Sequence, residues 1–147
     1  MIASAPVAAD AGDVAVAVVG GLAAVVAALI GAGRLSGRAS PEARELVTRL
    51  SGAARAVRHA VDSASGGSPD PRAVSDARYL TTEVRAHADG VRGLLRRGSE
   101  ADVDTALEAM SVSLKSLAAG DVPAAHDHAT AAEQAVAEAA RKTGSRR

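Results

Sequence analysis

The sequence predicts an all-α protein in which an N-terminal single transmembrane helix precedes an antiparallel four-helix bundle or two αα-hairpins. Three observations predict this fold class. An uncharged apolar run near the N-terminus is long enough to cross a bilayer. Four later segments repeat apolar residues at the spacings of three and four that are typical of amphipathic helices. No segment shows a competing strand pattern.

The apolar run extends from Val14 to Gly33 and contains 20 consecutive residues without a charge or a hydroxyl group. At about 1.5 Å per residue, such a helix spans roughly the 30 Å hydrocarbon core of a bilayer. Its seven alanines and four glycines make the hydrophobicity modest. The alternatives are a cleaved secretory signal, which would need a basic n-region that is missing, and a buried central helix of a soluble bundle. We expect a transmembrane helix.

The charges that flank this run predict its orientation. Asp10 and Asp13 precede it, whereas Arg34 and Arg38 follow it and are expected to contact lipid head groups. Because basic flanks stay in the cytoplasm, the N-terminus should be outside and the C-terminal domain cytoplasmic. The bias toward Ala, Gly, Val and Arg is typical of GC-rich bacterial genomes. The expected location is therefore a bacterial cytoplasmic membrane.

Small residues recur four apart within the apolar run, a pattern that lets two membrane helices approach closely. An Ala/Gly-rich helix also produces such spacings by chance, so self-association is a hypothesis. The residues that would form this contact are Ala17, Gly20, Gly21, Ala24, Ala28 and Gly31.

The later helices have recognisable start signals. Ser40-Pro41 and Asp70-Pro71 each combine an N-cap residue with proline at the first helical position, and Asp121 restarts the chain after a glycine. Helices are expected at about 41–64, 71–97, 100–119 and 122–141. The predicted organisation is a short extracytoplasmic tail (1–13), the transmembrane helix (14–33), a juxtamembrane basic linker (34–39), a helical bundle (40–142) and a disordered tail (143–147).

Each predicted helix carries an apolar seam with alternating spacings of four and three residues, as in coiled coils. The residues that we expect to form the bundle core are Leu46, Leu50, Val57, Leu80, Val84, Val91, Leu107, Met110, Leu114 and Leu117. Residues 34–97 hold 12 arginines against 7 acids, whereas residues 98–147 hold 5 bases against 8 acids. The two hairpins should therefore attract one another electrostatically. Lipid head groups are the alternative partner for the distal arginines.

The chain has no cysteine, and its four histidines are the candidates for metal binding or acid–base chemistry besides the carboxylates. His126 and His128 are two residues apart, about 200° around a helix, so they cannot easily bind one metal together. The sequence lacks a His-Glu-x-x-His motif, a phosphate-binding loop and a nucleophile elbow. We predict no catalytic residue, no metal and no cofactor.

His87 is the one histidine on a predicted apolar seam. It could be a buried pH switch or a specificity-giving polar residue in the core. The other interpretation, which we prefer, places it at the edge of the bundle with one nitrogen solvated or hydrogen-bonded.

These features predict a membrane-anchored, non-enzymatic interaction or scaffold protein that presents a cytoplasmic helical bundle to a protein partner or to itself. The alternative is a membrane-active or pore-forming homo-oligomer assembled through the Gly/Ala-rich helix. The partners predicted are membrane lipid, a protein and a second copy. Nucleic acid is not expected, because Tyr79 is the only aromatic residue and the sequence pI is about 6.9.

Overall fold

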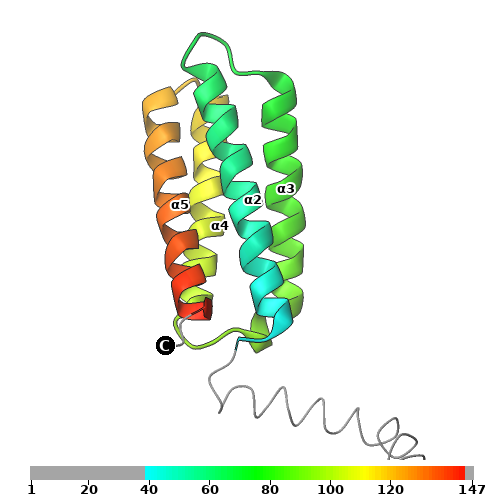
Figure 1. The fold of residues 1–147 in the computed structure, drawn as a ribbon. Coiled ribbons are helices and arrows are strands. Elements are labelled where there is room, and N and C mark those ends of the chain that lie inside the picture. The colour runs from blue at the N-terminus through cyan, green and yellow to red at the C-terminus, as the bar shows by residue number, and fades with distance from the viewer. Residues whose placement is uncertain (1–38, 145–147) are drawn as a thin grey trace, which may run out of the picture. The chain divides into compact units, whose positions relative to one another are not determined.

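The computed structural model describes residues 39–144, and four α-helices form an antiparallel bundle over this range (Figure 1). The helices are α2 (Pro41–Ala64), α3 (Pro71–Val91), α4 (Ser99–Ala118) and α5 (Val122–Gly144), with a 3-10 turn, η1 (Arg92–Leu94), after α3. The described range contains no strand, which confirms the all-α class there. The predicted transmembrane helix, its small residues, Arg34 and Arg38 lie outside the described residues.

None of the helices within residues 39–144 combines the length and the apolar character that crossing a membrane requires.

The predicted start signals cap three of the helices. The Ser40 hydroxyl accepts a hydrogen bond from the backbone N–H of Ala43 at 3.1 Å, and an Asp70 oxygen accepts from the N–H of Arg72 at 2.9 Å. An Asp121 oxygen likewise accepts from the N–H of Ala124 at 3.1 Å. These side chains satisfy backbone donors that have no partner within a helix, so the chain stops and restarts where the sequence predicts.

The end of α3 differs from the prediction. The helix was expected to continue to residue 97, but it ends at Val91 and the chain then forms η1. Gly90 and Gly93 lower helix propensity in this segment. Leu95 adopts an extended backbone (φ −74°, ψ 148°) and is buried, whereas Leu94 is only half-buried. The chain therefore leaves the helix and buries Leu95. A further helical turn would have placed Leu94 on the seam instead.

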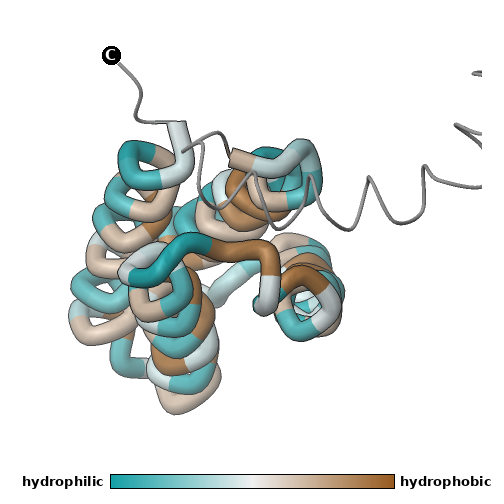
Figure 2. The backbone as a smooth tube through the Cα atoms, turned by 90° about the horizontal axis from the view of Figure 1, so that it is seen from below, coloured by the Kyte–Doolittle hydropathy of each residue, from teal (hydrophilic) through white to brown (hydrophobic). Residues whose placement is uncertain are grey.

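The core lies between the four helices, and Figure 2 shows the more hydrophobic positions lying mainly toward the centre of the bundle. Every predicted seam residue is buried except Leu80, which is half-buried and packs against the core. Of the 27 buried hydrophobic residues in the described range, 14 are alanines. Leu46, Leu50 and Met110, all 0% exposed, are the largest side chains that are fully enclosed. The bundle therefore combines close helix approach with a few large side chains.

The four helices are not equally well packed. The pair α4 and α5 makes the most extensive contact, and α2 packs against both α3 and α5. The contact between α3 and α4 is the sparsest of these, although the two helices are consecutive. Helix α3 is thus attached mainly through α2, and its remaining surface is exposed.

Candidate functional site

Ion pairs join the helices of each hairpin and the two hairpins. The Arg49 guanidinium donates to Glu45 within α2 and to Glu83 on α3, both at 3.0 Å or less. The hydrogen bond from Arg49 lowers the pKa of the Glu45 carboxyl. Lys142 of α5 lies 2.7 Å from an Asp102 oxygen on α4. These exposed or half-exposed pairs fix side-chain geometry more than they add stability.

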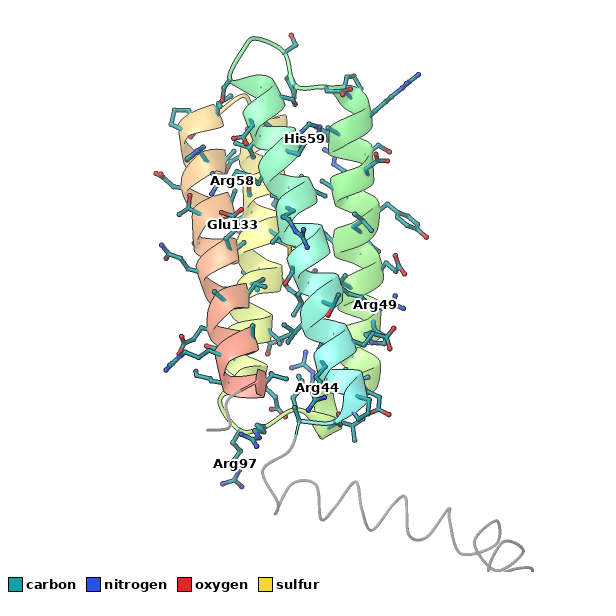
Figure 3. The ribbon with its side chains drawn as sticks, viewed as in Figure 1. Arg44, Arg49, Arg58, His59, Arg97 and Glu133 are labelled. Atoms are coloured by element: carbon teal, nitrogen blue, oxygen red, sulfur yellow. The ribbon has the colours of Figure 1, made fainter. Side chains whose placement is uncertain are left out.

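Two ion pairs between the hairpins run in the predicted direction, with arginine on the first hairpin side and an acid on the second. Arg58 of α2 pairs with Glu133 of α5 at 2.6 Å, and Figure 3 shows the two side chains side by side. Arg92 in η1 contacts both carboxylate oxygens of Asp104 on α4, at 2.9 and 3.0 Å. Such two-point contacts are the better-ordered kind of surface pair.

Arg58 is the centre of the most extensive polar network between α2 and α5. Besides Glu133, its guanidinium donates to the Thr130 hydroxyl at 2.8 Å and lies 2.9 Å from Nε2 of His126. A guanidinium only donates, so Nε2 of His126 is the acceptor in this contact. The network positions α5 against α2. The sequence alone does not indicate this network, because its partners are 68 to 75 residues apart.

The histidines do not converge on a metal site. His126 faces Arg58, whereas His128 lines a shallow surface hollow with Asp104 and Glu108 of α4. Within residues 39–144, no three His, Cys, Asp or Glu side chains are close enough together to hold a metal ion. The spacing argument about His126 and His128 therefore agrees with their positions.

His87 is half-buried near the end of α3, and its Nε2 atom is buried without a hydrogen-bond partner among the described residues. The half-buried position fits the expected place at the edge of the bundle. Nε2 is not the solvated or hydrogen-bonded nitrogen that was expected there, whereas Nδ1 is not among the buried atoms without a partner. A buried polar atom without a partner carries its full desolvation cost.

Replacing His87 by leucine should therefore leave the free energy of unfolding unchanged or raise it by up to about 1 kcal/mol. Leucine fills a similar volume on the seam and has no polar atom to desolvate. Urea unfolding followed by circular dichroism measures the change. The same substitution at the exposed His59 is the control and should give no gain. A loss of stability larger than 1 kcal/mol in His87→Leu would show that the imidazole makes a necessary contact.

A groove opens where α3 and α4 fail to pack closely. This α3–α4 groove has a volume of about 350 Å³ and is lined by Arg78, Thr81, Thr82, Arg85, Ser111 and Leu114. Arg85 donates to the Ser111 hydroxyl at 2.7 Å and to the Leu107 carbonyl at 3.3 Å, which holds its guanidinium against α4. The lining contains two arginines and no carboxylate, so the groove is electropositive.

The exposed side of α3 carries a row of uncharged residues that sequence analysis overlooked. Tyr79 is 68% exposed and is the only large hydrophobic side chain exposed in the described range. We define the α3 outer face as the exposed residues Ser75, Tyr79, Thr82, Ala86 and Gly90. Their spacing of four, three, four and four is itself a helical pattern, so the signal was present in the sequence but was hidden beside the more apolar seam.

No protein-family model, no curated protein and no solved structure matches this chain.

Proposed function

We propose that this chain is a membrane-anchored, non-enzymatic interaction protein whose helical bundle is held at the cytoplasmic side of a bacterial membrane. The observation that carries the proposal is the run of 20 residues without a charge or hydroxyl group at 14–33, with acids before it and arginines after it. This combination of length and flanking charge is what a single membrane-spanning helix needs.

The bundle supports the second half of the proposal, which concerns what the anchor presents. The α3 outer face and the electropositive α3–α4 groove lie on the helix that is least packed within the bundle. An exposed aromatic residue beside uncharged positions is the composition found in the centre of protein interfaces. We infer that α3 is the element that contacts a partner.

Carbonate extraction of membranes from cells that express the full chain tests the anchor. An integral protein stays in the pellet at pH about 11, whereas a protein held only by charge is released. We expect the chain in the pellet. Recovery of the chain in the supernatant would overturn the proposal.

The orientation is tested on spheroplasts and on inverted vesicles treated with protease. A C-terminal epitope tag should survive protease in spheroplasts and be removed in inverted vesicles, because the bundle is on the cytoplasmic side. The opposite pattern would reverse the orientation while leaving the anchor in place.

Small residues recur four apart, at Ala17 and Gly21 and at Gly20, Ala24 and Ala28, and this spacing favours a second candidate function, a pore-forming homo-oligomer. Dye release from vesicles reconstituted with the purified full chain separates the two candidates. The interaction protein should leave the vesicles sealed, whereas concentration-dependent release would favour the pore.

A further inference from the structure

The α3 outer face has an unusual composition for a solvated helix surface. All five of its residues are exposed, none is charged, and they extend over 16 positions from Ser75 to Gly90. The exposed side of an amphipathic helix normally carries charged residues. Tyr79 adds a large exposed aromatic side chain to this face. These residues do not contribute to the core, so their composition needs another explanation.

Gly90 leaves open space at one end of the α3 outer face. It lies within α3, its φ is not positive, and an added Cβ atom would meet no atom within 4 Å. The packing of the bundle therefore does not require glycine here. Gly90 is next to the last residue of α3, where its low helix propensity helps to end the helix. The missing side chain also leaves room for a second helix at this end of the face.

The α3 outer face is complementary to itself when two copies of α3 run antiparallel. Tyr79 and Ala86 lie equally far on either side of the midpoint between Thr82 and Glu83, and so do Ser75 and Gly90. A two-fold axis through that midpoint therefore places Tyr79 of one copy against Ala86 of the other. Each large side chain meets small residues, as an isologous interface requires.

The charges beside the face agree with the same axis. Arg78, Arg85 and Asp89 lie on one flank, and antiparallel helices bring this flank against its own copy. The Arg85 guanidinium is held against α4 by the Ser111 hydroxyl and the Leu107 carbonyl, which leaves Arg78 and Asp89 to face the second copy. Arg78 makes no ion pair with a described residue and would lie near Asp89 of the second copy, twice by symmetry. Asp89 already lies 3.4 Å from Arg92 of its own chain, but the closer contact of Arg92 is with Asp104, at 2.9 Å. Glu83 is nearest to the axis on the other flank, where Arg49 already neutralises it at 2.9 Å.

We propose that two copies of this chain associate through α3, antiparallel, with Tyr79 of each copy packed over Ala86 and Gly90 of the other. The partner of the proposed interaction protein is then a second copy of the same chain. This dimer rests on the proposed membrane anchor in one respect. A single pair of helices buries less surface than a stable dimer needs, so concentration in a membrane strengthens the contact. The electropositive α3–α4 groove lies beside this interface.

A cysteine at Thr82 tests the register, because the chain has no other cysteine. Helix axes about 8 Å apart place facing Cα atoms within about 6 Å, the range of a disulfide. Thr82→Cys in the full chain, in native membranes treated with copper phenanthroline, should give a disulfide-linked dimer.

Thr105→Cys on α4 is the matched control. Both threonines are exposed, and each hydroxyl donates to the carbonyl oxygen four residues earlier in its helix. We expect the control to remain monomeric. Equal cross-linking of the two variants, or none for a folded Thr82→Cys protein with unchanged circular dichroism, would overturn the inference.

A charge exchange tests the flank independently. Arg78→Asp and Asp89→Arg should each weaken the dimer roughly two- to tenfold, and the double variant should restore it, because two equivalent pairs are lost and then regained. Sedimentation of the full chain in detergent at several concentrations measures this. A double variant whose dimer is weakened by the sum of the two single effects would contradict the pairing of Arg78 with Asp89.

Carbonate extraction of the same membranes keeps this inference separate from the proposed function. A chain that stays in the pellet without Thr82 cross-linking removes the α3 dimer and leaves the anchor intact. If the chain is released, cross-linking is measured on the released protein, where dimer formation would support the contact without the anchor.

Discussion

Replacing Leu50 by alanine should lower the free energy of unfolding by about 3 kcal/mol and the melting temperature by roughly 15 °C. Leu50 lies in the middle of α2 and is 0% exposed. The surrounding core consists largely of alanine and valine, whose short side chains cannot extend into the space that the leucine leaves. A cavity therefore remains, and its cost adds to the lost transfer free energy.

The same substitution at Leu94 is the matched control for this prediction. Leu94 is half-buried in η1 and packs at the margin of the core, so the position can be filled by solvent. We expect Leu94→Ala to cost less than half as much as Leu50→Ala. Urea unfolding of both variants measures the difference. Equal losses at the two positions would show that the core does not depend on its few large side chains.

Two arginines in the apolar run should detach the chain from the membrane. A charged residue at the centre of a membrane helix costs about 2.5 to 3.5 kcal/mol on the insertion scale, and the proposed anchor has little surplus hydrophobicity because 11 of the 20 residues of the run are alanine or glycine. The double variant Leu22→Arg/Val25→Arg should therefore move from the carbonate pellet to the supernatant.

The control places the same two arginines on the basic flank, as Leu35→Arg/Ser36→Arg. This variant should stay in the pellet, because additional positive charge after the run reinforces the predicted orientation. Retention of Leu22→Arg/Val25→Arg together with this control would show that the run does not anchor the chain by spanning the bilayer.

Local signals predicted much of the bundle. Ser40, Asp70 and Asp121 cap helices where they were expected to, because an N-cap acts within three residues of its own position. The prediction for the end of α3 was wrong, because where this helix ends is not decided by local signals alone. The Val91-to-Leu94 spacing continues a helical pattern, but Leu95, in an extended backbone, is the residue that is buried.

The candidate interaction site was only partly predictable. The apolar run and its flanking charges are local features, so the sequence alone supports the anchor hypothesis. The α3 outer face consists of residues such as Thr82 and Ala86 that are unremarkable one by one. Only the structure shows that all of them are exposed and that a Cβ atom added at Gly90 would meet no atom within 4 Å.

The sequence by itself determined that residues 39–144 would contain four helices and which side of each helix would be buried, because apolar spacing acts through the period of the helix. Only the tertiary structure decided which helices meet. The loose contact of α3 with α4 and the pairing of Arg58 with Glu133 depend on how the two hairpins pack. The pattern of one helix does not determine which surface of another helix it will contact, because one apolar seam can pack against many helix faces of similar size and charge.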